Sequence, residues 1–296
     1  MTTILQIEAA TQKQGNSTSV LANDNNNNNT ITKSNTASNN LINEGISLLV
    51  LGKYNEAISL FDKALAVDQN NAYALSLKGI SLAGLHKYNE AISLFDKALA
   101  VDPNDVKTLT NKGNVFDTLG KHQEAIQYYD EALAIEPNDV VALEDKGSAL
   151  DLLQKYNEAI VYYDKALTLD PRNVNVIYNK GVALGKLGNY TQAIQYYDQA
   201  LAIEPNYTGA LMGKGFSLHQ LGNNDQAIVY YDKALAIEPK NTDTLTNKGF
   251  ALAALHKYNE AIKYYDKALA IEPTLLDAIN GKHLSLEVLK NQTQIK

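Results

Sequence analysis

The sequence predicts an all-α protein, built as a linear array of seven helix pairs that ends in a single capping helix. Two observations lead to this fold class. Each unit of 34 residues contains two segments whose apolar residues recur at the spacing of one helical face. All six prolines of the 296-residue chain also follow this period: Pro103, Pro137, Pro171, Pro205, Pro239 and Pro273. Such a period is typical of repeat proteins in which each unit packs only on its neighbours.

The N-terminal segment, residues 1–37, differs in composition from the rest of the chain. It contains an unbroken asparagine run at 25–29, flanked by Ser, Thr and further Asn. Because such a segment buries too little apolar surface to offset its ordering entropy, we expect it to be disordered. Ile4, Leu5 and Ile7 form a small apolar cluster near its start. This cluster either belongs to a loose terminus or covers the end of the first repeat.

Seven repeats follow this segment without insertion or deletion. They are 38–71, 72–105, 106–139, 140–173, 174–207, 208–241 and 242–275. Counted from the first residue of each repeat, position 4 is Leu or Ile, position 8 is Gly and position 11 is Leu or Phe. These positions share one face of a predicted first helix.

The second predicted helix of each repeat has Ala at position 20, an aromatic residue at 24, Ala at 27 and Leu at 28. Proline at position 32 ends this helix in six repeats. Five residues that directly precede a first helix are predicted N-caps, each worth about 1 kcal/mol. They are Asn71, Asp105, Asp139, Asn173 and Asn241. Because Gly at 8 and Ala at 20 are small, we expect the two helices to cross closely, with the aromatic residue filling space toward the next repeat.

This pattern resembles the tetratricopeptide repeat, and the likeness covers residues 38–275. Two positions depart from the family: its Trp at position 4 is Leu or Ile here, and its Leu at position 7 is Lys or, once, Glu44. The NKG form of the first helix resembles the long arrays of prokaryotic members. The resemblance implies antiparallel helix pairs stacked into a right-handed superhelix, whose first helices line a concave groove.

Residues 276–296 begin an eighth first helix with no second helix after it, so we expect a C-terminal capping helix. Its predicted apolar stripe comprises Leu276, Ile279, Leu286 and Leu289. His283 replaces the glycine of position 8, as expected where no second helix has to approach.

Composition argues against several function classes. The net charge is −7 and Arg172 is the only arginine, so a nucleic-acid partner is not expected. The chain has no cysteine, and no apolar run reaches the length of about 20 residues that a membrane span needs. The N-terminus does not resemble a secretion signal, so we expect a cytoplasmic protein. We expect no enzyme, metal or cofactor, because the five histidines form no ligand cluster and no phosphate loop is present.

The resemblance assigns the concave groove to positions 2, 5, 6, 9, 12 and 13. In the middle of the array these positions are acidic or carry amides: Asn111, Asn114, Asp117, Glu144, Asp145 and Asp151. Toward the C-terminal half they become apolar: Tyr178, Val182, Met212, Phe216 and Phe250. At the start they are apolar as well: Ile42, Ile46, Leu49 and Val50.

Position 6 carries asparagine in alternate repeats: Asn43, Asn111, Asn179 and Asn247. An amide both donates and accepts hydrogen bonds, so such a row can hold a peptide backbone. The arrangement resembles the asparagine ladder of the glycosyltransferase superhelix in the same family. Duplication of a two-repeat block explains the spacing equally well.

Lysine at position 7 and aspartate at position 25 form a second recurring set. The two interpretations are a surface charge ladder and a track for a polyanion. The ladder is favoured, because matching acids cancel the field of the lysines.

The sequence therefore predicts a non-catalytic scaffold or adaptor. Its groove is expected to bind an extended or helical partner segment that is basic or rich in amides and carries apolar anchors. The alternative is a self-associating structural protein that dimerises through its apolar N-terminal repeat, residues 38–51.

Overall fold

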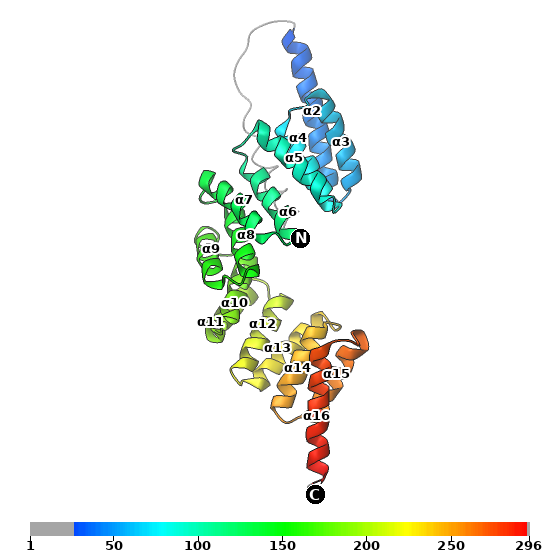
Figure 1. Ribbon diagram of the computed structural model, residues 1–296, viewed down its shortest axis with the longest axis vertical. Helices are drawn as coiled ribbons and strands as arrows, with labels where there is room; N and C mark the ends of the chain where they lie inside the picture. The colour runs from blue at the N-terminus through cyan, green and yellow to red at the C-terminus, as the bar shows by residue number, and fades with distance from the viewer. Residues whose placement is uncertain (1–26, 295–296) are drawn as a thin grey trace. The chain divides into compact units, whose positions relative to one another are not determined.

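The computed structural model describes residues 27–294, and this range contains fifteen α-helices (Figure 1). The first helices of the seven pairs are α2 (Asn27–Val50), α4 (Ala72–Gly84), α6 (Val106–Thr118), α8 (Val140–Leu152), α10 (Val174–Lys186), α12 (Thr208–Gln220) and α14 (Thr242–Ala254). The second helices are α3 (Tyr54–Val67), α5 (Tyr88–Val101), α7 (His122–Ile135), α9 (Tyr156–Leu169), α11 (Tyr190–Ile203), α13 (Asn224–Ile237) and α15 (Tyr258–Ile271). The last helix is α16 (Leu276–Gln294). The all-α fold of seven helix pairs and a final helix is confirmed.

The contacts within the chain divide it into two compact units, with the division between Asp145 and Lys146 in α8. The first unit contains α2 to α7 and the start of α8. The second contains the rest of α8 and α9 to α16. The expectations for Ile4, Leu5 and Ile7 lie outside the described residues. Helix α2 begins at Asn27, so residues 27–37 of the segment with a disordered composition belong to a helix that continues into the first repeat.

Each pair closes around a glycine and an aromatic ring of the same repeat. A Cβ atom at Gly113 would lie 2.5 Å from Cε1 of Tyr129, and one at Gly147 would lie equally close to Tyr163. Both rings are almost completely buried. The ring at position 24 therefore fills the space above the glycine of its own repeat, which corrects the expectation that it mainly fills space toward the next one. Only the outer end of the ring extends to the next repeat. Tyr197, for example, lies directly against Gly213 of the following repeat.

The turn between the two helices of a pair has one residue in the left-handed region, at position 15. Glycine fills this position in four repeats, at Gly52, Gly120, Gly188 and Gly222, with φ between 71° and 80°. The other three repeats place His86, Gln154 and His256 there, with φ of 60° or 61°. A side chain in this region costs about 1–2 kcal/mol, so these three turns carry strain that the glycine turns avoid.

All five predicted N-caps are confirmed. The side chains of Asn71, Asn173 and Asn241 each accept a hydrogen bond from the backbone N–H three residues later. Asp139 does the same with Ala142, at 2.8 Å. Asp105 instead accepts from the N–H of Lys107, two residues later.

The lysines of position 7 form inter-repeat contacts and do not lie on an open surface. Lys180 donates to the carboxylate of Asp164 in the preceding repeat and, at 2.6 Å, to the hydroxyl of Tyr196 in its own repeat. Its side chain is only 9% exposed, whereas that of Asp164 is 55% exposed. Lys112, Lys214 and Lys248 make equivalent contacts. For these four lysines, the expected surface ladder is therefore corrected to a row of largely buried cations, each held by an exposed carboxylate and a tyrosine.

Helix α16 packs on the preceding pair with a different face from the predicted one. Ala278, Gly281 and Ser285 are buried, and Gly281 lies directly against the ring of Tyr265. Leu276 and Leu286 of the predicted stripe are exposed, because the face that contains them points away from the preceding pair. The stripe prediction was therefore wrong, although His283 is exposed as expected.

Candidate functional site

The first unit contains a cavity of about 300 Å³. It is lined by Leu49, Tyr54, Ile80, Ala83, Gly84, His86, Tyr88, Phe95, Asn111, Asn114, Val115 and Thr118. Most of these residues occupy predicted groove positions on α2, α4 and α6. The others are Val115 on α6 and residues of α3, α5 and the turn between α4 and α5. We call this cavity the groove pocket.

One wall of the groove pocket depends on the absence of a side chain at Gly84. A Cβ atom there would lie 2.6 Å from both Cε1 and Cζ of Tyr54, so the tyrosine ring lies directly on α4. The other repeats have Val, Thr, Leu, Lys, Gln or Ala at this position. The close approach of a ring to α4 at position 13 is therefore special to this repeat.

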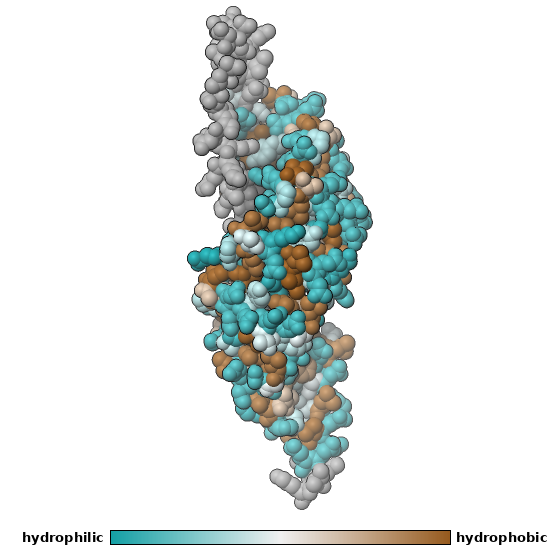
Figure 2. Space-filling view, turned by 90° about the vertical axis from the view of Figure 1, so that its left-hand side faces the viewer, coloured by the Kyte–Doolittle hydropathy of each residue, from teal (hydrophilic) through white to brown (hydrophobic). Residues whose placement is uncertain are grey.

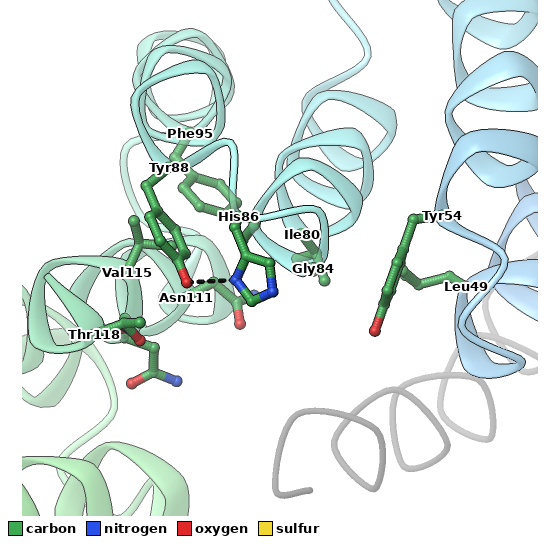
Figure 3. Close-up of a pocket in the computed structure, with 12 residues that line it drawn as sticks. Leu49, Tyr54, Ile80, Gly84, His86, Tyr88, Phe95, Asn111, Val115 and Thr118 are labelled. Carbon is green, nitrogen blue, oxygen red and sulfur yellow. Dashed lines mark hydrogen bonds between the residues drawn. The ribbon is translucent and has the colours of Figure 1, made fainter.

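The turn after α4 supplies another part of the pocket (Figure 3). Nδ1 of His86 lies 2.8 Å from the hydroxyl of Tyr88, and the two rings meet edge to face. This contact holds the imidazole at the edge of the cavity. The backbone of His86 is in the left-handed region. His256 and Tyr258 repeat the contact at 2.8 Å in the second unit.

Two predicted groove residues on α6, Asn111 and Asn114, line the pocket together. Asn111 is half-buried, and its side chain makes no hydrogen bond within the described residues. Asn114 accepts a hydrogen bond from the Tyr129 hydroxyl at 2.6 Å. It also shares a side-chain hydrogen bond with Asp145. Asn114 therefore connects the pocket to the carboxylates of the next repeat.

Glu144 and Asp145 belong to the next repeat, and Asp117 lies beside Asn114 on α6. We call these three residues the acidic cluster. Burial raises the pKa of Asp145 to about 7; the hydrogen bond with Asn114 opposes this rise, and the nearby charges of Glu144, Asp117 and Asp139 add to it. Oδ2 of Asp145 is buried and has no hydrogen-bond partner. Asp117 lies 2.7 Å from Nδ1 of His122. The cluster thus concentrates negative charge beside the pocket.

The second unit gathers the predicted apolar groove residues around tyrosines. The Tyr178 ring lies 5.0 Å from that of Tyr207 and 6.0 Å from that of Tyr197, and Val182 packs in the same cluster. Oδ1 of Asp151 is buried without a hydrogen-bond partner. Burial raises the pKa of Asp151, while the charge of Lys186 acts in the opposite direction.

The remaining predicted residues differ in accessibility. Phe216 is 39% exposed and meets Tyr190 edge to face, so it is available to a ligand. Phe250 packs against Tyr265 as part of a core cluster. Met212, Asn179 and Asn247 are half-buried.

The predicted apolar start of the groove is corrected by the structure. Ile42, Ile46 and Leu49 are at most 4% exposed, and they pack with Phe61 and Leu77 in a core cluster. Their apolar character therefore reflects the core of the first pair, although Leu49 also borders the groove pocket. Asn43 is exposed on α2 and does not line the groove pocket.

Sequence reasoning missed four residues that shape the groove pocket: Tyr54, Gly84, His86 and Tyr88. The available signal was a departure from the repeat pattern, because glycine occupies position 13 only at Gly84.

Figure 2 shows that, on the described part of the face it presents, hydrophobic residues form small groups between hydrophilic ones. No helix within residues 27–294 is both long enough and apolar enough to cross a membrane.

Family models of the tetratricopeptide repeat match most of the chain. The model described as "Tetratricopeptide repeat" matches residues 106–139, 174–207, 209–241 and 242–275, and a second with the same description matches 42–106. A further model, described as "TPR repeat", matches residues 147–188. The chain belongs to the tetratricopeptide repeat (TPR) family and forms a TPR solenoid. TPR repeats typically mediate protein–protein interactions.

Several solved structures resemble the chain. YrrB, described as a TPR protein with an unusual peptide-binding site, is 26% identical; the match covers 64% of this chain and 97% of YrrB, with a TM-score of 0.53. PilF of Pseudomonas aeruginosa is 23% identical, with 72% and 96% covered and a TM-score of 0.65. A tetratricopeptide repeat protein of Parabacteroides merdae is 18% identical, with 85% and 99% covered and a TM-score of 0.64. The last two structures show only that the fold is shared. Comparison with curated protein sequences gives no match.

Proposed function

We propose that this chain is a non-catalytic scaffold that binds a segment of a partner protein at the concave positions of its first helices. The observation that carries the proposal is the groove pocket, because it lies at these positions and combines apolar walls with the free amide of Asn111. The peptide-binding site of YrrB supports the same class of ligand.

The expected partner segment is basic or rich in amides and carries apolar anchors. The acidic cluster supports a basic segment in the first unit, and exposed Phe216 supports an apolar contact in the second. The asparagines of position 6 are proposed to hold the backbone of the segment. Asn111 and Asn179 are the members to test, since both are half-buried on first helices.

Site-specific photo-crosslinking tests the location of the partner. A benzophenone side chain at Ala83 or Phe216 is expected to capture partner proteins from a native lysate, whereas one at exposed Gln127 on the second helix α7 is expected to capture none of them. Capture from Gln127 alone would contradict binding in the groove. The double variant Asn111→Ala, Asn179→Ala is expected to weaken capture, and undiminished capture would remove the role of the asparagines.

Self-association through residues 38–51 receives less support. The residues that suggested it, Ile42, Ile46 and Leu49, are buried within the first unit. Leu51 remains 70% exposed at the end of this segment. Sedimentation at several protein concentrations is expected to show a single species of constant mass.

A further inference from the structure

The groove pocket and the acidic cluster form one continuous surface feature of the first unit. Asn114 belongs to both, because it lines the pocket and shares a hydrogen bond with Asp145. Asp117 stands one helical turn after Asn114 on α6, and its side chain is 24% exposed. The groove pocket and the acidic cluster are therefore close enough for one short segment of a partner protein to contact both.

We propose that this feature recognises a two-residue motif, a bulky apolar or aromatic residue next to a lysine or arginine, in an extended partner segment. The apolar side chain enters the groove pocket, and the cationic side chain lies against Asp117 and Asp145. The inference rests on the proposed function and adds to it the identity of the motif and the place where it binds.

The size of the groove pocket limits what it can hold. Pockets for small molecules range from about 300 to 1,000 Å³, and this one, at about 300 Å³, lies at the lower limit. It therefore suits one large side chain better than a cofactor-sized ligand. Ile80, Ala83 and the ring of Tyr54 are half-buried and offer the accessible apolar surface, whereas Leu49, Phe95 and Val115 line the cavity with at most 4% of their surface exposed. Fully desolvated anchors of this kind contribute most of the binding energy in protein interfaces.

The polar groups around the pocket specify the rest of the motif. Asn111 has an unused amide on the pocket wall, which can donate to and accept from the peptide backbone beside the anchor. Asp117 is 24% exposed beside the pocket, and the neighbouring Asp145 has a buried carboxylate oxygen, Oδ2, without a hydrogen-bond partner. A lysine or arginine next to the anchor would be attracted to these two carboxylates, whereas an acidic neighbour would be repelled.

The test begins with an array of short capped peptides that carry every pair of residues at two central positions in a Gly/Ser background. The full chain is expected to select pairs of Phe, Tyr, Leu or Met with Lys or Arg. The best peptide is then labelled with fluorescein, and its affinity is measured by anisotropy with the wild-type chain and with variants.

Gly84→Leu places a side chain against Tyr54 and is expected to weaken binding at least about tenfold, as for an interface anchor. Ala254→Leu is the matched control, because Ala254 occupies the same position 13 in the seventh repeat; it should leave the affinity within about twofold of wild type. Asp145→Asn removes charge without changing size and is expected to abolish the preference for a basic neighbour. Circular dichroism checks that each variant is folded, and Asp145→Asn decides the question if Gly84→Leu is not.

Three results would overturn the assignment. If peptides bind but Gly84→Leu retains wild-type affinity, or if the array shows no preference for the motif, the groove still binds peptides but not in this way. If no peptide binds and the crosslinks from Ala83 and Phe216 are absent, the proposed function fails as well. If a peptide that copies residues 1–14 displaces the probe more strongly than the selected peptide does, the occupant is the chain's own N-terminal segment.

Discussion

The contact between Lys180, Asp164 and Tyr196 offers a direct test of how neighbouring repeats are held together. Substitution of Lys180 by methionine keeps a long apolar stem and removes only the ammonium group. The wild-type ammonium donates to both partners and lies 4.3 Å from the centre of the Tyr196 ring. Removing it leaves Asp164 well hydrated, because that carboxylate is 55% exposed.

The magnitude follows from these contacts. A hydrogen bond to a charged group contributes about 1.5–3 kcal/mol and a cation–π contact about 0.5–2 kcal/mol, while desolvation of the ammonium offsets part of the sum. We therefore expect Lys180→Met to lower the free energy of unfolding by about 1–2 kcal/mol. Lys78→Met should cost less than about 1 kcal/mol, because Lys78 contacts Asp62 but Leu94 stands where the tyrosine would be.

Urea unfolding followed by circular dichroism measures both effects, and hydrogen exchange locates them, since repeat arrays can unfold in parts. A double-mutant cycle with Tyr196→Phe isolates the lysine–tyrosine term. Equal losses for Lys180→Met and Lys78→Met, together with no coupling between Lys180 and Tyr196, would refute the reasoning.

The pH dependence provides a second check on this contact. Burial alone would lower the pKa of Lys180, but the hydrogen bonds to Asp164 and Tyr196 and the charge of Asp164 raise it above the ordinary value of 10.5. The contribution of the charged lysine is therefore complete below pH 10.5 and is lost as the pH rises through the higher pKa of the folded state. The difference between wild type and Lys180→Met should stay constant from pH 7 to 9 and shrink only above pH 10.5.

Three further predictions concern single positions. Gln154→Gly should raise the free energy of unfolding by about 0.5–1 kcal/mol, because φ is 60° there; the measurement is urea unfolding, and no gain would argue against strain in this turn. Ala159→Leu should lower stability by about 1–3 kcal/mol through overpacking of a fully buried site, and an unchanged thermal midpoint would contradict the close helix crossing. Asp145→Asn should stabilise the chain at pH 8 and have little effect at pH 4. The reason is that a carboxyl whose pKa is about 7 when folded and 3.8 when unfolded destabilises the folded state increasingly between these values; equal effects at both pH values would exclude this cause.

The helices and their ends could be predicted from the sequence because they depend on local chemistry. A proline cannot continue a helix, and Asn or Asp before a first helix has only nearby N–H groups to bind. All five predicted caps accept such a bond, whether from an N–H two residues away, as at Asp105, or three, as at Asn173. Comparison of the seven repeats also shows which positions always carry the same residue type and which positions vary.

The contacts between repeats could not be read from the same pattern. Positions 7 and 25 showed that Lys and Asp recur together. They did not show that lysines such as Lys180 join the aspartate of the preceding repeat to the tyrosine of their own. That convergence depends on how one helix pair is placed on the next. Burial of Lys180 follows from this placement, and the residues surrounding it are distant in sequence. The same reason explains the wrong stripe on α16, where the face that packs is set by the preceding pair.

The groove pocket could be predicted only in part from the repeat pattern. The groove positions of the repeat identified Asn111 and Asn114, whereas one wall of the cavity depends on Gly84, where the residue differs from those of the other repeats. Other glycines that break it, Gly209 and Gly213, lie directly against the rings of Tyr178 and Tyr197. Small residues outside the period therefore mark places where a tyrosine approaches the backbone of a first helix. At Gly84 such a ring borders the groove pocket, so residues that depart from the repeat pattern help to locate a candidate binding site as much as the repeated positions do.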